Sequence, residues 1–213
     1  GGIANITLIP PSVGPDRMRP VLGWDCGPAN SLIDLAMETF SEGQERCDRD
    51  GAMAALGQVM AEPLENWLRE PYFHRPAPKS TGRELFGRED LKRRLTELQP
   101  ASPEDQMATL TAFTAAVVAQ DLQHLSHLDL PRPVEMVVAG GGRRNRTLMR
   151  ELQSRCQGLR VRPSDELQLP CESREALVFA LLAWWHHRQL PGNAPSITGA
   201  ERCCVLGVRA DPA

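Results

Sequence analysis

The sequence predicts an α/β fold, and three observations carry that prediction. The apolar run at residues 134–139 is followed by three glycines and a helical pattern at 145–155, which is half of a βαβ unit. The first residues alternate and are rich in β-branched side chains, and a Pro/Gly turn follows them, so residues 3–24 predict a β-hairpin. A helical pattern starts directly after that hairpin, so strands give way to helices along the chain.

The other elements follow in chain order. Apolar positions predict a helix from Pro28 to about residue 40, because a proline in the first turn has no hydrogen bond to lose. Ser102, as a cap before Pro103, predicts the start of a long helix over 103–124. The remaining expected elements are two short helices (50–60 and 61–69), a charged surface helix (89–98), a short strand (159–161) and a helix (173–187).

Composition limits the classes of protein. A chain of 213 residues with 41% hydrophobic residues can bury a core without disulfides or a structural metal. The formal charge of −3 argues against a nucleic-acid groove, which needs clustered positive charge. The apolar run at 176–185 is too short to cross a bilayer and predicts a buried core helix. Six cysteines without a C-x-x-C pair, and five histidines without metal-ligand spacing, predict a reduced, intracellular protein with no metal on its side chains.

Asp25 is the first candidate for chemistry. It lies where the hairpin ends and a helix begins, so its carboxylate can accept a proton or can cap the turn at Asn30. The pattern leaves both interpretations open.

Two loops are weaker candidates. Gly140, Gly141 and Gly142 lie between a strand and a helix, where a backbone without Cβ atoms admits a phosphate or a flat base, although many such turns carry glycines only for packing. The loop "PKSTGRE" groups Lys79, Ser80, Thr81 and Arg83 around Gly82. It is either an anion site or a solvated segment that caps the next helix, and it lacks the P-loop order.

Several collinear strings together resemble one family: "GGIANIT", "WDCGPANSLID", "DRDGAMAALG", "EPYFHRPAPKSTGRELF", "ATLTAFTAAVVA", "AGGGRRNRTLM", "EALVFALLAW" and "LPGNAPSITGA". They look like anhydro-N-acetylmuramic acid kinase, over essentially the whole chain. The resemblance implies a ribonuclease-H-like lobe of the sugar kinase/Hsp70/actin superfamily, with a central mixed sheet flanked by helices. It also implies ATP and Mg²⁺ as cofactors, and a reaction that opens a 1,6-anhydro sugar and phosphorylates its 6-oxygen.

The resemblance also assigns residues. Asp25 matches the family's catalytic base. Gly1, Gly2, Ala4 and Asn5 match a turn that resembles the second phosphate loop of the superfamily, and Gly140, Gly141, Gly142 and Asn145 match its adenosine motif. Asn30, Asp34 and Glu175 are expected to border the sugar. Ala29 departs from the family, which more often has glycine there, and Arg143 and Arg144 add charge that contacts phosphates or faces solvent.

The resemblance places residues 1–213 in the C-terminal lobe, and the N-terminal lobe with the first phosphate loop is expected upstream. It implies cytoplasmic recycling of a cell-wall sugar, with the sugar and ATP as partners, no nucleic acid or membrane, and a homodimer. Two other functions stay open. One is a non-catalytic module that binds a nucleotide or a partner, and the other is a hydrolase that uses Asp25 and Glu175 without ATP.

Overall fold

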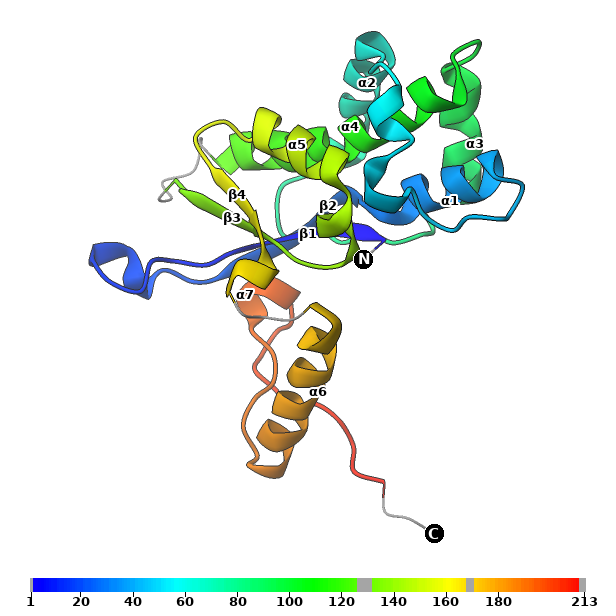
Figure 1. Cartoon of the computed structure of the whole chain (residues 1–213). Helices are drawn as coiled ribbons and strands as arrows, with labels where there is room; N and C mark the ends of the chain where they lie inside the picture. The colour runs from blue at the N-terminus through cyan, green and yellow to red at the C-terminus, as the bar shows by residue number, and fades with distance from the viewer. Residues whose placement is uncertain (1, 126–131, 168–170, 211–213) are drawn as a thin grey trace.

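The structure is a computed structural model that describes residues 2–125, 132–167 and 171–210, without the side chains of 171–174. The chain combines helices with short strands, so the α/β class is confirmed (Figure 1). The described residues form two separate two-stranded sheets. The single central mixed sheet implied by the resemblance is therefore not what these residues build.

The first sheet is the predicted hairpin. Strands β1 (Ile3–Leu8) and β2 (Leu22–Pro28) pair antiparallel, with Asn5 opposite Asp25. The register shifts between Ala4 and Asn5, and such a bulge bends a strand and re-aims its side chains.

The strand runs further than the sequence suggests. Because β2 continues through Asp25 to Pro28, which pairs with Ile3, helix α1 (Asn30–Phe40) starts two residues later than predicted. The prediction that Pro28 opens the helix is wrong, because its backbone belongs to the sheet.

The second sheet completes the predicted βαβ unit. Strands β3 (Glu135–Val138) and β4 (Arg160–Pro163) are parallel, and α5 (Arg146–Arg155) connects them. Leu148 and Leu152 of α5 are buried, and α5 packs on the long helix at the centre of the molecule (Figure 1).

That central helix is α4 (Pro103–His124), and its bounds are those predicted. The hydroxyl of Ser102 accepts a hydrogen bond from the Asp105 amide at 3.1 Å, as the cap prediction requires. Every residue from Gln106 to Ala119 is buried, because β2, α5 and three other elements pack around α4. Those three are α1, α2 (Ala61–Leu68) and the 3₁₀ helix at Ala54–Leu56.

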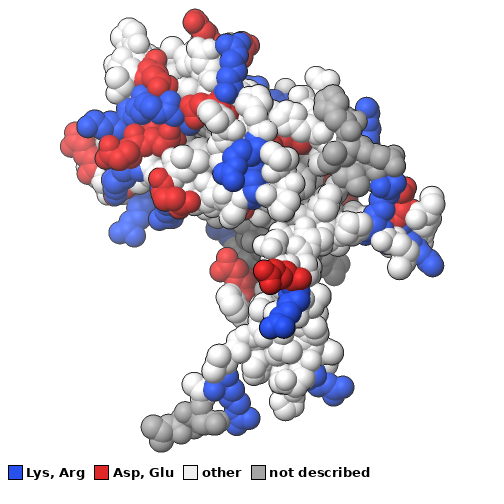
Figure 2. All heavy atoms as spheres, turned by 180° about the vertical axis from the view of Figure 1, so that it is seen from behind, with Lys and Arg blue, Asp and Glu red and all other residues white. Residues whose placement is uncertain are grey.

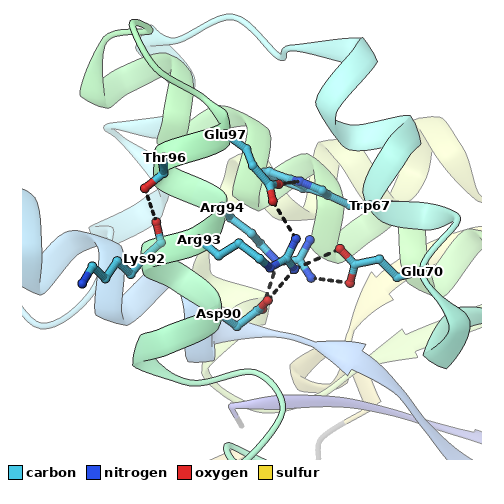
Figure 3. Close-up of polar contacts among 8 residues, drawn as sticks. All are labelled: Trp67, Glu70, Asp90, Lys92, Arg93, Arg94, Thr96 and Glu97. Atoms are coloured by element: carbon cyan, nitrogen blue, oxygen red, sulfur yellow. Dashed lines mark hydrogen bonds and ion pairs between the residues drawn. The ribbon is translucent and has the colours of Figure 1, made fainter.

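Helix α3 (Arg88–Glu97) is more than a charged surface helix. The Arg94 side chain is fully buried, and its guanidinium donates to Asp90 and to Glu70, each at 2.9 Å (Figure 3). It also lies over the Trp67 ring, 4.8 Å from the centroid. The many charged residues of this helix predict an exposed Arg94, because a fully buried arginine is rare unless it is paired.

The expected helix at 50–60 is replaced by two short 3₁₀ helices, Arg49–Gly51 and Ala54–Leu56. Asp48 explains the tight turn, because its buried carboxylate accepts from the amides of Met53 and Ala54 at 2.8 and 3.0 Å. Such side-chain bonds to the backbone compete with a continuous helix.

The C-terminal part contains α6 (Cys171–His187) and a one-turn helix that was not predicted, α7 (Pro195–Thr198). Helix α6 extends away from the sheets (Figure 1). The prediction of a buried core helix is wrong here, because most of its described apolar residues are exposed and none is buried, with Phe179 at 69% exposure. On the face seen in Figure 2, the projecting part shows mostly uncharged residues with a few charged side chains among them. Within the described residues, no helix is both long and apolar enough to cross a membrane.

Candidate functional site

Asp25 lies within β2, half-buried between the buried residues Trp24 and Cys26. The cap interpretation is wrong, because Ala29 is the N-cap residue of α1 and no side chain makes a cap hydrogen bond there. The carboxylate therefore has a different set of partners.

The Asp25 carboxylate accepts three hydrogen bonds. Asn5, opposite it on β1, donates from Nδ2 to Oδ1 at 2.9 Å. The Ser80 hydroxyl and the Thr81 amide both donate to Oδ2 at 3.0 Å. A carboxylate with donors on both oxygens keeps one orientation, and it retains lone pairs for a further proton or water.

The backbone of Asp25 is also fixed. Its amide donates to the Lys79 carbonyl at 3.0 Å, and the Tyr72 hydroxyl donates to its carbonyl at 2.8 Å. Burial, helped by the charge of Asp25, raises the pKa of Tyr72 well above its usual value. Tyr72 therefore stays protonated and remains a donor.

The start of β1 lies over the N-terminus of α1. The Gly2 carbonyl accepts from the amides of Ala29 and Ser31 at 2.9 and 3.0 Å. The guanidinium of Arg83 approaches the same glycine, and its Nε lies 3.6 Å from the position that a Cβ of Gly2 would take. Gly1, predicted to belong to the same phosphate loop, lies outside the described residues.

The Gly-rich loop meets α1 at Asn30. The position of a Cβ on Gly142 would lie 3.3 Å from Asn30 Oδ1, and that of a Cβ on Gly141 would lie 3.7 Å from Asn30 Nδ2. Gly140 has a φ of 91°, a backbone conformation that favours glycine. The structure thus brings the predicted residues Asn30, Gly141 and Gly142 together.

The residues that follow this loop have structural partners. The Asn145 side chain accepts from the Leu148 amide at 2.8 Å and so caps α5. Arg143 pairs with Asp165 and donates to the Gly140 carbonyl at 3.2 Å. Its side chain is 6% exposed, so Arg143 braces the loop instead of facing solvent.

Asp34 lies one turn beyond Asn30 on α1 and is half-buried. Burial raises the pKa of its carboxyl to about 6, although the positive charge of Arg83 opposes this shift. Asp34 therefore takes up a proton within a pH range in which exposed carboxylates stay ionised.

Glu175 is exposed on α6. Among the described residues, no hydrogen bond or ion pair joins it to Asp25 or to the partners of Asp25. Its predicted place beside the sugar stays a prediction.

The contacts of the "PKSTGRE" loop were not predicted from the sequence. Ser80 and Thr81 bind the Asp25 carboxylate, and Lys79 is buried in an ion pair with Asp121. The interpretation of this loop as a cap for a helix at 83 is wrong, because α3 begins at Arg88. An anion site in the loop stays a prediction. No local pattern revealed the pairing, because Lys79 and Asp121 are 42 positions apart.

The arrangement suits proton transfer beside a bound anionic ligand. An oriented carboxylate, Asp25, lies on the same hairpin as Gly2, which contacts the N-terminus of α1. That terminus carries partial positive charge and in turn borders the Gly-rich loop. The described residues contain no group of three or more His, Cys, Asp or Glu side chains that could hold a metal ion.

Comparisons with known proteins agree on one family. The model for anhydro-N-acetylmuramic acid kinase matches residues 1–211. Proteins of that name from Synechococcus sp. (strain CC9311) and Synechococcus sp. (strain WH7803) are 66% and 65% identical to this chain over all 213 residues. A relative of the same name from Prochlorococcus marinus (strain MIT 9303) is 62% identical over the same length. The chain spans 56%, 55% and 56% of these three relatives, respectively.

Proposed function

Because the chain belongs to the anhydro-N-acetylmuramic acid kinase family, we propose that it supplies part of the active site of such an enzyme. The reaction uses ATP and water to open the 1,6-anhydro ring of anhydro-N-acetylmuramic acid. The product is N-acetylmuramic acid 6-phosphate. Two bonds change in one site, so one group must activate water for attack at the anomeric carbon while the 6-oxygen is phosphorylated.

The observation that carries the proposal is the oriented carboxylate of Asp25. Its two oxygens are held by Asn5, Ser80 and Thr81. In this orientation Asp25 accepts a proton from the attacking water, and its negative charge stabilises the positive charge that develops at the anomeric carbon. General-base catalysis of this kind contributes about 10² to 10⁴-fold to a rate.

The Gly-rich loop fits a nucleotide. The atoms nearest to where a Cβ on Gly141 or Gly142 would lie belong to Asn30 and Leu148, and a Cβ there would narrow the space. ATP, when bound, supplies the phosphoryl group that the 6-oxygen takes. The glycine backbone of this loop would bind its phosphates, and Mg²⁺ would be held through phosphates and water more than through side chains.

The nucleotide proposal gives the neighbouring residues their roles. Gly1, Gly2 and Asn5 border the phosphates, with Asn5 also orienting Asp25. Asn145 keeps the Gly-rich loop in place by capping α5. Asn30, Asp34 and Glu175 remain the proposed contacts to the sugar.

The proposal extends to the architecture. We infer that the chain is the C-terminal, ribonuclease-H-like lobe of a two-lobed kinase, and that a central mixed sheet forms in the longer protein. The exposed α6 and the short two-stranded sheets support this inference. The enzyme acts in the cytoplasm of a bacterium that recycles cell-wall sugar, and it forms a homodimer.

The test is turnover of 1,6-anhydro-N-acetylmuramic acid by this sequence within a chain of the relatives' length, with and without ATP. Appearance of the 6-phosphate only with ATP is the expected result. Ring opening without ATP would identify a hydrolase, and nucleotide binding without turnover would identify a non-catalytic module.

A further inference from the structure

Two buried charges lie beneath Asp25, and the proposed reaction does not use either of them. Lys79 Nζ and Asp121 Oδ1 are 2.8 Å apart, and their side chains are only 1% and 6% exposed. Taking two charges out of water costs free energy that their attraction offsets only when the geometry is good. Such a costly buried pair beside a candidate catalytic group suggests a role in the geometry of the site.

Asp121 holds the strand that carries Asp25. Its Oδ2 accepts from the indole Nε1 of Trp24 at 2.9 Å, and Trp24 directly precedes Asp25 in β2. On the other side of Asp25, burial together with Asp121 raises the pKa of the Cys26 thiol well above its usual value. Cys26 therefore stays a neutral thiol that can donate to Asp121.

Lys79 holds the loop that binds the Asp25 carboxylate. Its carbonyl accepts the amide of Asp25, and the next two residues, Ser80 and Thr81, supply both donors to Oδ2. Its ammonium group also lies 5.1 Å from the centre of the Tyr72 ring, and Tyr72 donates to the Asp25 carbonyl.

One carboxylate of α4 thus joins two segments that are far apart in the sequence. Asp121 binds Trp24 in β2 through Oδ2 and Lys79 in the loop through Oδ1. The two segments meet at Asp25, which belongs to β2 and is hydrogen-bonded to the loop. If either bond to Asp121 is lost, one of the two segments loses its link to α4 at this carboxylate, and the hydrogen bonds at Asp25 must hold the strand and the loop together.

We propose that Asp121 and Lys79 are positioning residues for Asp25. The buried pair fixes the strand and the loop to α4, and so sets the direction of the Asp25 carboxylate. Its catalytic consequence rests on the proposed function, in which Asp25 is the base. Small misplacements of a reacting group can cost about 10²-fold in rate.

The first test measures geometry without activity. In a chain of the relatives' length, amide hydrogen exchange is compared at Thr81 and Asp25 for the wild type, Asp121→Asn and Lys79→Met. Both amides belong to the bonds that join loop and strand. We expect exchange to rise at least about tenfold at these two amides, with no comparable rise along α5, because only local openings change.

The second test measures turnover. We expect Asp121→Asn to lower kcat about tenfold or more and to leave KM for ATP within about twofold, because the buried pair is not among the residues proposed to bind the nucleotide. Ser80→Ala provides a variant that is expected to fold, since Ser80 is exposed, and it should lower kcat in the same manner.

The matched control is Arg94→Met. Arg94 is also a fully buried cation that pairs with carboxylates, and like the Lys79–Asp121 pair it contacts α4, with its guanidinium 4.5 Å from the centre of the Phe113 ring. At a temperature where it is folded, this variant should lose stability and keep both kcat and slow exchange at Thr81.

The outcomes separate the two proposals. Unchanged exchange at Thr81 together with unchanged kcat in Asp121→Asn would overturn the positioning role alone. An equal loss of kcat in Arg94→Met would also overturn it, because destabilisation would then explain the effect. Full turnover by Asp25→Asn would instead overturn the proposed function.

Discussion

At the scale of single residues, the site depends on what lies around one carboxylate. The sequence pattern located Asp25 but left open whether it caps a helix. In the structure Asp25 does not cap α1, because β2 runs through Asp25. Its carboxylate instead accepts hydrogen bonds from Ser80 and Thr81. These partners come from a loop 55 positions away, and no local rule predicts such a contact. Asn5 was expected near phosphates, yet its amide binds Asp25.

Asp34 gives a prediction for pH dependence. Its pKa of about 6 in the folded protein lies above the usual 3.8, so the folded state binds a proton more tightly than the unfolded state. As the pH falls from about 7 to about 4, the wild type should gain stability relative to Asp34→Asn. The free energy of unfolding of both proteins, measured by urea titration across this range, checks the prediction. A constant difference between the two would contradict it.

At the scale of elements, prediction succeeded where local signals agree with the packing. Helix α4 has a capping serine, a first-turn proline and a long apolar pattern, and its bounds are as predicted. Prediction failed where contacts distant in sequence decide. The pairing of Pro28 with Ile3 extends β2 in this way. A local contact was missed as well, because the carboxylate of Asp48 binds the nearby amides of Met53 and Ala54 and replaces a helix by tight turns. Helix α7 was missed because it is one turn long.

Helix α7 docks on β2 at a glycine. A Cβ on Gly23 would lie 2.7 Å from Ile197 Cγ2, closer than side chains pack, and Ser196 donates to the Val21 carbonyl at 3.0 Å. Gly23→Ala should therefore lower the free energy of unfolding by about 1 to 3 kcal/mol, as overpacking does. Adding Ile197→Ala makes room for the new methyl group.

A double-mutant cycle measures this coupling. The combined variant should be less destabilised than the sum of the two single variants by about 1 kcal/mol. Additive effects, measured by chemical denaturation, would show that Gly23 and Ile197 do not contact each other.

At the scale of the whole molecule, the core and the C-terminal part differ. Helix α4 collects buried side chains from several elements, while α6 leaves Leu177, Phe179 and Trp184 exposed. The sequence predicted burial of α6 from its apolar composition alone. An apolar composition indicates that a helix packs against other residues, but it does not show whether those residues belong to the same 213-residue segment. This chain spans just over half of its relatives' length. Exposed apolar patches of this kind are rare on isolated soluble proteins.

The exposure of α6 has a measurable consequence for the 213-residue chain. It should bind a hydrophobic dye such as 8-anilinonaphthalene-1-sulfonate, because the dye needs accessible apolar surface. Phe179→Glu should reduce the dye fluorescence severalfold and leave the free energy of unfolding within about 0.5 kcal/mol, since the side chain is 69% exposed. A stability loss typical of a core residue would show that α6 is buried.

We propose that Asp25 is the base of an ATP-dependent anhydro-sugar kinase. The most direct measurement compares wild type and Asp25→Asn in a chain of the relatives' length, by turnover of 1,6-anhydro-N-acetylmuramic acid and by ATP affinity. We predict that Asn at this position lowers kcat by about 10² to 10⁴-fold, with ATP affinity within about threefold and the fold intact. A folded Asp25→Asn enzyme that turns over at the wild-type rate would contradict the claim.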